Sequence, residues 1–521
     1  MNPLASRNYF DLVRERAALR PDHPAVIDRH AEISYGALAD RARRIAGALQ
    51  ASGIARGSKV GALVNNRVEW LELCFGANAV GAVLVPFSTW STEAEFDYLI
   101  RDSGIEILFA LDQFGGQDFG AILNRLNAAE LCPALREIVM LGASYEAFRA
   151  SAEPFEGPSL GQPEDDALIL YTSGSSARPK AVRLVNRGLV ENGFAIGERM
   201  GLSPEDRVLV SPPLFWSYGS ANALPAILTH GATMVLQGRF EPGEALELIE
   251  RHRCTALYTL PAMTNALVAH PVFNRSRTAS LRTGLTLGTP QDLRIAAGRL
   301  GVPRICNIYG ATEIYGNCCV TPADWPLERR ATCQGPPLPS VRVRIVDPDT
   351  RAPRPIGEPG EVEVKGYVTP GYAGASAEHN ISAFTADGYF RTGDLAYLDE
   401  AGYFHFVGRE SEMIKRAGIN VSPAEVEDAL QRHAAVAAVA VVGAPDSRRG
   451  EVIFAFVVPV SGREIDAEAL RAHCRSRLSS YKVPDRIEFC DTLPVTKTGK
   501  LFKRELKEQA RRLAAASEEM R

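Results

Sequence analysis

Short apolar strands alternate with helical segments through the first half of the sequence. KVGALV (Lys59–Val64) is followed by a helical stretch through Val80 and then by AVLVPFS (Ala82–Ser88). A second helical pattern, EAEFDYLIRDS, leads into EILFA (Glu106–Ala110). This alternation predicts an α/β fold of doubly wound layers with mainly parallel strands. The same rhythm continues through DRVLVS, GATMVLQ, CTALYTL and PRICNIYG.

The pattern changes after Gln334. SVRVRIVD and GEVEVKG alternate apolar and polar residues between connections rich in proline and glycine. Such alternation is typical of antiparallel strands, so we expect a small β-barrel-like subdomain or a side sheet here.

A further change follows GRESEMIK (Gly408–Lys415). SPAEVEDAL predicts a helix with Ser422 as N-cap, Pro423 at its first position and Glu425 at its third. AVAAVAVVGA and EVIFAFVVPV then predict two strands of a small α+β unit. We therefore expect a large N-terminal domain, residues 1–408, and a small mobile C-terminal domain, residues 409–521.

Composition excludes several classes of function. The chain has 521 residues, too many for one core, and its 46% hydrophobic and 23% charged residues are ordinary for a globular protein. A net charge of −4 does not indicate the basic surface that binds nucleic acid, and no apolar run reaches the length of a membrane span.

Targeting and metal signals are weak as well. The N-terminus lacks the apolar core of a secretory signal, and its pattern favours a first structural helix. Nine cysteines without a CxxC pair indicate reduced thiols and a cytoplasmic location. Nine histidines without ligand spacing predict no transition metal held by the protein.

Four segments carry candidate chemistry. The first, YTSGSSARPK (Tyr171–Lys180), follows an apolar run and combines hydroxyl side chains, a glycine and a lysine. It is not a Walker A motif, because no Gly-Lys-Ser/Thr follows the glycine at the required spacing. Its hydroxyls and backbone N–H groups suit a polyanion, to which Lys180 adds a positive charge. A hydroxyl-rich turn with a solvated lysine is the alternative.

The second segment, IYGATEIYG (Ile308–Gly316), ends the predicted strand RICNI. Open α/β sheets bind ligands at the carboxyl ends of their strands. Tyr309 can stack on a base, Thr312 can bond a phosphate, and Glu313 can hold Mg²⁺ between phosphate oxygens. A strand-terminal turn with a buried tyrosine is the alternative.

The other two segments lie further along the chain. Asp394 and Arg409 are expected at turns between strands, each next to a glycine, where a carboxylate can accept from both ribose hydroxyls and an arginine can reinforce it. A surface ion pair is the alternative. Lys500, in LPVTKTGKLFKREL, lies in a basic segment near the C-terminus, where most lysines are solvated.

In this order and spacing, the four segments resemble the adenylate-forming superfamily of acyl-CoA synthetases, peptide-synthetase adenylation domains and firefly-type luciferases. GAPDSRRGE (Gly443–Glu451) and INVSPAEVE (Ile419–Glu427) add to the resemblance. It implies an acid–CoA ligase that uses ATP and Mg²⁺ to form an acyl-adenylate and then passes the acyl group to coenzyme A, with release of AMP and pyrophosphate.

The resemblance also implies site residues. Tyr309 would stack on adenine, Thr312 would meet the α-phosphate, Glu313 would hold Mg²⁺, and Lys500 would bridge the attacking carboxylate and the α-phosphate. The remaining nucleotide site would consist of Thr172, Ser173, Gly174, Ser175, Ser176 and Lys180 at the phosphates, Gly288, Thr289 and Pro290 near adenine, and Asp394 and Arg409 at the ribose.

After adenylation, Lys500 must leave the carbonyl so that a pantetheine arm can approach it. A pivot of the small domain near Glu410 and Ser411 would bring the strand near Gly418 to the site for the thiol. The sequence departs from the family at three positions: Ala177 replaces a common glycine, Ser411 a common Asp or Lys, and Trp216 a common histidine. None of the three removes a group that the chemistry demands.

By family position, the acyl pocket would be lined by a mixture of apolar and polar residues: Trp216, Tyr218, Asn222, Leu287, Gly288, Ile308, Ile314 and Asn317. Polar groups in the pocket favour an aryl or short-to-medium-chain acid over a long alkyl chain, because unpaired buried amides are costly. Whether Trp216 shapes the pocket or packs as core is open.

Three functions remain open at this stage. The first is a stand-alone acid–CoA ligase. The second is an adenylating enzyme that passes the acyl group to a carrier protein or an amine, and the third is a non-catalytic nucleotide-binding homologue. The sequence leaves the acid, a carrier-protein partner and a homodimer undecided.

Overall fold

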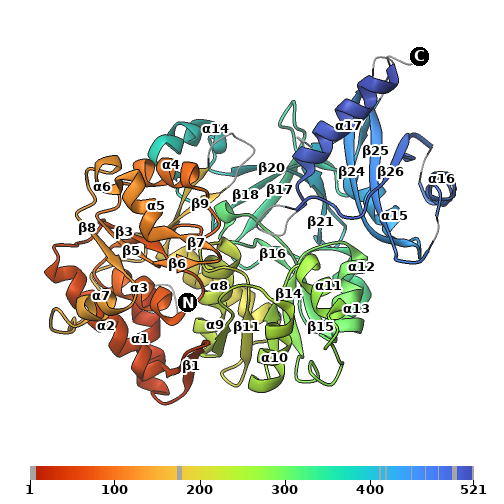
Figure 1. The fold of residues 1–521 in the computed structure, drawn as a ribbon. Coiled ribbons are helices and arrows are strands. Elements are labelled where there is room, and N and C mark those ends of the chain that lie inside the picture. Colours follow the sequence, from red (N-terminus) through yellow and green to blue (C-terminus); the bar gives the residue numbers. More distant parts are fainter. Residues whose placement is uncertain are drawn as a thin grey trace.

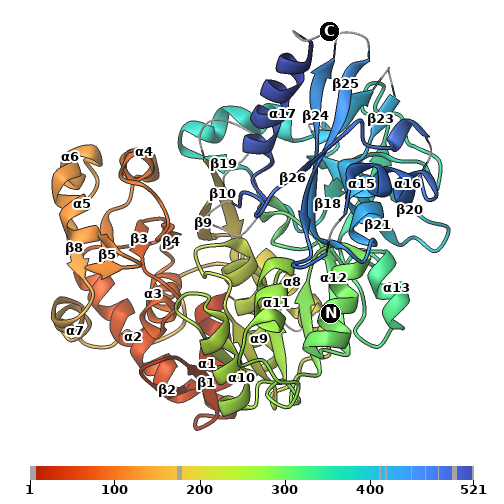
Figure 2. The same ribbon diagram turned by 45° about the vertical axis from the view of Figure 1, so that its right-hand side comes forward.

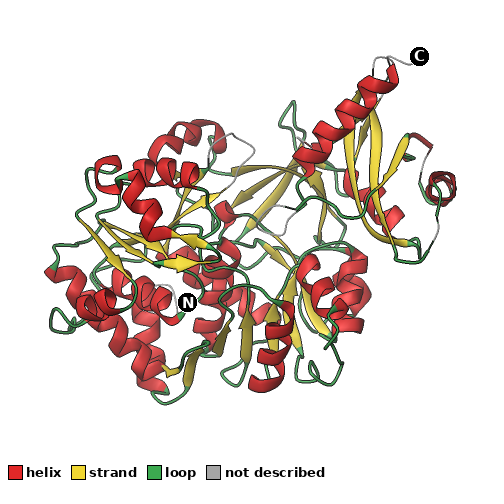
Figure 3. Ribbon diagram, viewed as in Figure 1, coloured by secondary structure: helices red, strands yellow, loops and turns green. Residues whose placement is uncertain are grey.

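The computed structural model describes residues 8–172, 179–409, 412–416, 419–446, 449–463, 465–478, 480–495 and 501–518. Most of the chain forms a large N-terminal part built on three sheets, and a smaller C-terminal part with its own sheet lies beside it (Figures 1 and 3).

The first sheet of the large part has eight strands in the order β16-β15-β14-β13-β11-β12-β1-β2. The six strands from β15 to β1 run parallel, and the two edge strands are antiparallel. Their bounds are β1 Pro24–Ile27, β2 Glu32–Ser34, β11 Arg207–Val210, β12 Thr233–Leu236, β13 Ala256–Tyr258, β14 Thr283–Thr286, β15 Arg304–Tyr309 and β16 Cys319–Val320.

The second sheet has seven strands in the order β19-β10-β9-β4-β3-β5-β8. The strands from β9 to β8 are parallel, whereas β10 pairs antiparallel with β9 and β19. Their bounds are β3 Lys59–Leu63, β4 Val83–Pro86, β5 Ile107–Ala110, β8 Glu137–Met140, β9 Asp166–Thr172, β10 Lys180–Val185 and β19 Tyr372–Ala373, with a separate hairpin of β6 Gln113–Phe114 and β7 Gln117–Asp118.

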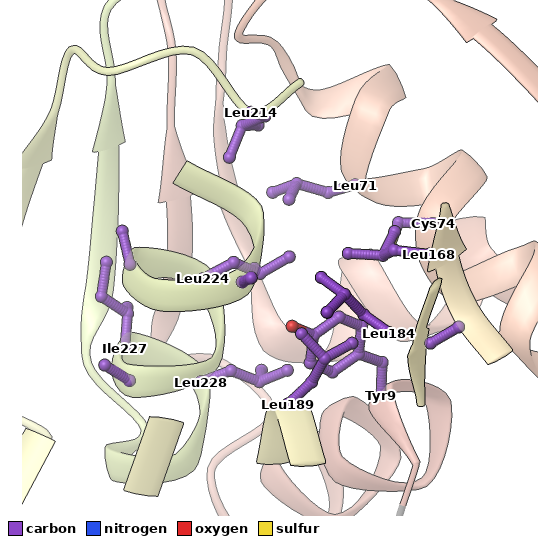
Figure 4. Packing of buried hydrophobic residues seen from close by; sticks show 14 of the residues in the cluster. Tyr9, Leu71, Cys74, Leu168, Leu184, Leu189, Leu214, Leu224, Ile227 and Leu228 are labelled. Atoms are coloured by element: carbon purple, nitrogen blue, oxygen red, sulfur yellow. The ribbon is translucent and has the colours of Figure 1, made fainter. Parts of the chain in front are cut away.

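Helices cover these two sheets, and a continuous apolar core lies between them. Figure 4 shows part of this core, where Leu224 and Leu228 lie opposite Leu189 and Tyr9. The helices are α1 Tyr9–Leu19, α2 Tyr35–Ala51, α3 Val68–Ala79, α4 Glu93–Ser103, α5 Phe119–Leu126, α6 Ala128–Leu131, α7 Ala143–Arg149, α8 Asn186–Met200, α9 Leu224–His230, α10 Pro242–His252, α11 Pro261–Ala269, α12 Pro290–Arg294, α13 Leu327–Thr332 and α14 Asn380–Ala383.

Four shorter helical segments interrupt or extend this set. Two are π-helices, η1 (Tyr218–Ala223) and η2 (Ile295–Leu300), and two are 3₁₀ turns, η3 (Thr312–Ile314) and η4 (Gly374–His379). Single π-helical turns inside helices are rare and often occur at functional sites.

The π-helix η1 runs into α9, and a proline explains part of its geometry. Pro225 has no N–H to donate to a carbonyl in the preceding turn. The carbonyl oxygen of Ser220 instead accepts a 2.9 Å hydrogen bond from the hydroxyl of Tyr9 on α1. The N-terminal helix is thereby tied to η1.

The third sheet is antiparallel, in the order β17-β18-β20-β21. Its strands are β17 Arg342–Val346, β18 Gly360–Lys365, β20 Phe390–Leu398 and β21 Phe404–Arg409. It is the antiparallel unit that the sequence predicts, in the form of a side sheet.

The C-terminal part has the strand order β23-β22-β25-β24, with β26 pairing parallel to β25. Its helix α15 contacts β21 of the side sheet, and the small sheet stands beside that sheet in both views (Figures 1 and 2). The elements are β22 Ile414–Arg416, β23 Ile419–Val421, α15 Pro423–Gln431, β24 Val436–Asp446, β25 Gly450–Pro459, α16 Ala467–Arg475, η6 Ser480–Lys482, β26 Arg486–Phe489 and α17 Lys503–Glu518.

One detail of this part differs from the sequence prediction. Ser422 stands at the N-cap of α15, with Pro423 at the first helical position, but its side chain makes no capping hydrogen bond. The Ser422 hydroxyl instead donates to the carbonyl oxygen of Val407 over 2.6 Å. Packing against β21 therefore takes the hydroxyl that local propensity assigns to the cap.

The predicted fold class, doubly wound α/β layers with an antiparallel unit and a small α+β part, is confirmed. The proposed boundary after residue 408 falls one residue before the end of β21 and stays a prediction. Among the described residues, no helix combines the length and apolar character that crossing a membrane requires.

Candidate functional site

A tight turn leaves the carboxyl end of β15, where open parallel sheets bind their ligands. It begins at Gly310, and a Cβ at that position would lie 1.8 Å from the carbonyl oxygen of Gly316. Only glycine permits this approach. The turn contains η3, so Tyr309, Thr312 and Glu313 all lie at the same end of β15.

A buried carboxylate lies next to this strand end. The Tyr309 hydroxyl donates to Oδ2 of Asp394 over 2.7 Å, and Arg409 Nε lies 3.2 Å from Asp394 Oδ1. Burial raises the pKa of Asp394, and the Arg409 charge and the Tyr309 hydrogen bond offset part of that rise. The site thus holds a desolvated carboxylate between one neutral and one charged donor.

The sequence prediction that Asp394 and Arg409 lie at turns is wrong. They occupy paired positions on β20 and β21, directly opposite each other. Gly393 has φ +69°, and the pairing of β20 with its other neighbour, β18, changes register between Arg391 and Leu395, on either side of this glycine. The glycine therefore marks an irregularity within paired strands, a common role for glycine in a sheet.

Two phenylalanines stack on Tyr309. Its ring centroid lies 4.3 Å from that of Phe404 and 5.7 Å from that of Phe406, with nearly parallel planes. Because the two residues are two positions apart on β21, both project from the same side of the strand. Burial raises the pKa of Tyr309, and the neighbouring Asp394 charge adds to the rise.

A second cluster connects Glu313 to the lysine of the first sequence motif. The Tyr372 hydroxyl donates to Oε1 of Glu313 over 3.1 Å, and Lys180 Nζ lies 5.2 Å from the centroid of the Tyr372 ring. Lys180 is paired with Thr172 across β9 and β10. Burial, followed by the Glu313 charge, raises the pKa of Tyr372.

The nearby segment of residues 288–290 caps α12. The Thr289 hydroxyl and Asp292 form a capping box, and Pro290 occupies the first helical turn. Gly288 has φ +146°, and a Cβ there would lie 2.7 Å from Asp292 Oδ2 and 2.9 Å from Pro261 Cγ. Burial, together with the Asp428 charge on α15, raises the pKa of Asp292.

The turn after β15 is also joined to the predicted acyl segment. The Thr312 hydroxyl donates to Oγ of Ser217 over 3.0 Å. Trp216 is half-buried and packs edge-on against Trp90, with ring centroids 5.0 Å apart. The Tyr218 hydroxyl donates to the carbonyl oxygens of Thr259 and Leu285, so its polar end is engaged by the backbone.

Four of the other predicted acyl residues are buried, and one is exposed. Ile308 and Ile314 lie in one core cluster with Tyr218. Asn222 and Asn317 are fully buried, whereas Leu287 is 39% exposed.

Several predicted positions lie outside the described residues, and the structure gives no account of them: Ser173, Gly174, Ser175, Ser176, Ala177, Glu410, Ser411, Gly418 and Lys500.

The sequence reasoning missed some residues that position this site. Tyr372 contacts both Glu313 and Lys180, yet it lies in an unremarked glycine-rich segment. Asp292 is the exception for which a signal existed, because Thr289-Pro290 followed by an acid is a capping-box pattern.

The side chains at the strand ends suit a ribose, phosphates and a cation. Together with two doubly wound sheets and a small C-terminal part, they indicate the class of nucleotide-using enzymes. Comparison with known proteins gives the family. The family model described as AMP-binding enzyme matches residues 13–373, and the model described as AMP-binding enzyme C-terminal domain matches residues 425–500. The chain belongs to the AMP-binding enzyme family, and the predicted membership in the adenylate-forming superfamily is confirmed.

Individual relatives agree with this placement. The chain is 35% identical over 499 residues to a feruloyl-CoA synthase from Amycolatopsis sp, which covers 94% of this chain and 97% of the relative. Two solved structures match nearly the full length: ATP-bound MatB from Rhodopseudomonas palustris (28% identity, TM-score 0.87, 98% of this chain and 100% of that chain) and the anthranilate CoA ligase AuaEII in complex with anthranoyl-AMP (26% identity, TM-score 0.89, 98% of each chain). The predicted class of enzyme, an AMP-forming acid–CoA ligase, is confirmed.

Proposed function

We propose that this enzyme joins an aryl or short-to-medium-chain carboxylic acid to coenzyme A through an acyl-adenylate. The observation that carries the proposal is the buried Asp394 carboxylate, which lies between Tyr309 and Arg409 beside the β15 turn. A desolvated carboxylate accepts strongly from a diol such as that of ribose, because water does not compete for it. In this arrangement, adenine would stack near the ring of Tyr309.

Adenylation requires two anions to meet. An ionised carboxylate is nucleophilic at neutral pH, so no general base is needed. Positive charge and hydrogen-bond donors must instead stabilise the negative charge that gathers at the α-phosphorus. We assign the α-phosphate to Thr312, the β- and γ-phosphates to Lys180 and the hydroxyl loop, and the bridging contact to Lys500.

Glu313 would hold the magnesium ion that accompanies ATP. One carboxylate together with phosphate oxygens and waters is a donor set that suits Mg²⁺. The Tyr372 hydroxyl fixes one carboxylate oxygen of Glu313, which orients the side chain. Bound Mg²⁺ would neutralise part of the charge of the phosphates.

The second half-reaction needs the carbonyl to be free of Lys500. We propose that the small domain, residues 409–521, pivots near Glu410 and Ser411 and presents the strand near Gly418 to the pantetheine arm. Such a motion would move α15 relative to α12, with which it is in contact in the present arrangement.

Two observations support the proposed acid class. Feruloyl-CoA synthase and the anthranilate CoA ligase are both named for acids with an aromatic ring. In this chain the half-buried Trp216 and the buried Ile308 and Ile314 border the turn, while Asn222 and Asn317 place amides there.

The cytoplasm is the compartment that we propose, because all nine cysteines are free thiols.

A pyrophosphate-release screen over aryl, alkyl and hydroxylated acids, with and without coenzyme A, tests the function. We expect AMP and acyl-CoA to form together from at least one aryl or medium-chain acid. AMP release that needs a carrier protein or an amine in place of coenzyme A would establish the alternative acceptor. Absence of pyrophosphate release from every acid would leave only nucleotide binding and would overturn the proposal.

A further inference from the structure

Three buried asparagines surround the end of the β15 turn. Asn192 on α8 donates through Nδ2 to the carbonyl oxygens of Tyr315 and Asn317, over 3.2 and 2.9 Å. Asn222 on η1 packs on Gly316, where an added Cβ would lie 3.1 Å from Asn222 Cβ. All three asparagine residues have 0% exposure.

Most of the hydrogen-bonding capacity of these amides is unused. Among the described residues, neither the Nδ2 nor the Oδ1 atom of Asn222 or Asn317 has a hydrogen-bond partner, and the same holds for Oδ1 of Asn192. Five of the twelve such buried atoms in the described part of the chain therefore belong to this one place. Folded proteins satisfy the great majority of their buried polar groups, because an unpaired one is destabilising.

Both amides belong to residues of the predicted acyl pocket, and they adjoin the turn that carries Thr312 and Glu313. Asn222 lies on η1, which begins directly after Trp216 and Ser217, and Ser217 accepts the hydrogen bond of Thr312. Asn317 follows Glu313 by four residues on the same turn. The Tyr218 hydroxyl is already engaged by backbone carbonyls, so the two amides are the unused polar groups of the predicted pocket.

We propose that Asn222 and Asn317 form a specificity pair that hydrogen-bonds a neutral polar group on the part of the acid remote from its carboxylate. This inference rests on the proposed function. An amide offers both donors and an acceptor, and so it matches a hydroxyl or a carboxamide, which also carry both. A purely hydrocarbon acid would leave the amides unpaired and dry, and a site of that kind discriminates strongly against such an analogue.

The pair determines selectivity and not the chemical step, since neither residue is assigned to the carboxylate or the phosphates. The experiment compares kcat/KM for matched acids that differ by one hydroxyl: benzoate with para-hydroxybenzoate, and hexanoate with ω-hydroxyhexanoate. Wild type, Asn222→Leu and Asn317→Leu are measured alongside Asn78→Leu. Asn78 is the matched control, because it is a buried asparagine on α3 whose Oδ1 also lacks a partner in the described residues.

In wild type, we expect the hydroxylated acid of at least one pair to be preferred by at least about tenfold. Asn222→Leu and Asn317→Leu should reduce that preference by at least about fivefold, through loss on the hydroxylated acid and gain on its parent. Asn78→Leu should leave the ratio unchanged. Asn222→Ala and Asn317→Ala, which add no bulk beside Gly316, replace any leucine variant that does not fold.

Two results overturn the inference. A wild-type ratio near one in both pairs, or a preference that survives in both variants, would mean that the amides hold only internal water or serve packing. In either case acyl-CoA formation from the parent acids would leave the proposed function standing. If no acid of the wider panel releases pyrophosphate, the proposed function fails and this inference fails with it.

Discussion

The Tyr309 hydroxyl donates a 2.7 Å hydrogen bond to Oδ2 of Asp394, a residue that lies 85 positions later in the chain. The bond joins the end of β15 in the first α/β sheet to β20 in the antiparallel side sheet. Two sheets of different type thus share one buried polar contact. We place the ribose of ATP at this contact, and the first prediction tests it.

Tyr309→Phe removes this hydrogen bond and keeps the ring. We expect KM for ATP to rise about tenfold and the free energy of unfolding to fall by roughly 2 kcal/mol at pH 7, because a buried carboxylate loses a donor. The pKa of Asp394 is raised in the folded state, so the loss of stability should be smallest in acid, where Asp394 is neutral, and grow as pH rises through the folded pKa.

The control for this variant is Tyr397→Phe on β20, the strand that carries Asp394; the Tyr397 ring stacks on His405. It should leave KM for ATP unchanged. Denaturant unfolding and ATP titrations at several pH values give both quantities. An unaltered KM for ATP in Tyr309→Phe would separate Tyr309 from the nucleotide.

Lys500→Ala should separate the two half-reactions. We expect the rate of adenylate formation, measured as pyrophosphate release, to fall at least about a hundredfold, because the bridging charge is lost at the α-phosphorus. Conversion of supplied acyl-AMP and coenzyme A to acyl-CoA should continue within about twofold. Lys503→Ala, which removes a lysine paired with Glu427 over 2.8 Å, serves as the control. Equal damage to both steps by Lys500→Ala would contradict the assignment.

Glu313→Gln tests the magnesium proposal. The Mg²⁺ concentration that half-saturates pyrophosphate release should rise about tenfold, because a neutral amide binds a hard cation less well than a carboxylate. Tyr372→Phe should produce a smaller rise, since it leaves the carboxylate but frees its orientation. The exposed Glu358→Gln is the control and should not change the Mg²⁺ titration. A shift of equal size in Glu358→Gln would show that general electrostatics, and not Glu313, sets the dependence.

Gly288→Ala tests the backbone of the segment that caps α12. At φ +146° an alanine is strained, and its Cβ would press on Asp292 and Pro261, so we expect a loss of roughly 1–3 kcal/mol in unfolding free energy and weaker ATP binding. Gly298→Ala is the matched control, because its Cβ would meet nothing within 4 Å in the helical η2. That variant should be neutral or slightly more stable. Thermal melts and ATP titrations compare the two.

Asp206 lies away from the site and gives a test of stability against pH. Burial alone would raise the pKa of Asp206, but hydrogen bonds from Arg282 and Thr255 outweigh it and hold the pKa below its ordinary value. A lowered pKa contributes stability above the unfolded value, about 3.9, and that stability is lost as pH falls through the folded pKa. Asp206→Asn should therefore cost roughly 3 kcal/mol at pH 7 and progressively less below pH 4.

The control is Asp40→Asn, which removes an exposed partner of Arg44 and should change stability little at any pH. Chemical denaturation from pH 7 down to the acid limit of folding measures both variants. A deficit in Asp206→Asn that stays constant with pH would show that hydrogen-bond geometry, and not charge, is responsible.

Periodicity alone predicted much of this fold. KVGALV, AVLVPFS and EILFA became β3, β4 and β5, because buried parallel strands are continuous apolar runs that differ plainly from the helices between them. The pairing of Asp394 with Arg409 escaped the same reasoning. From the sequence alone, Gly393 looks like a turn residue. Only the pairing with the opposing strand shows that the chain continues through it as an irregular strand.

Contacts between distant elements could not be predicted from the sequence for a similar reason. Ser422 has the composition of a helix cap, yet β21 offers its hydroxyl the carbonyl of Val407 instead. Tyr9 was predicted only as part of a first helix, and its hydrogen bond to Ser220 depends on the carbonyl that Pro225 leaves without a donor. Such partners depend on how whole elements pack, which no local pattern records.

Through the hydrogen bond from Tyr9 to Ser220, we expect the N-terminal helix to influence which acids the enzyme accepts. Ser220 lies two residues before Asn222, so any cut, tag or insertion that displaces α1 would disturb η1, at which we propose that the acid binds. Shortened or N-terminally fused forms of the enzyme should accordingly change which acids they accept well before they stop consuming ATP.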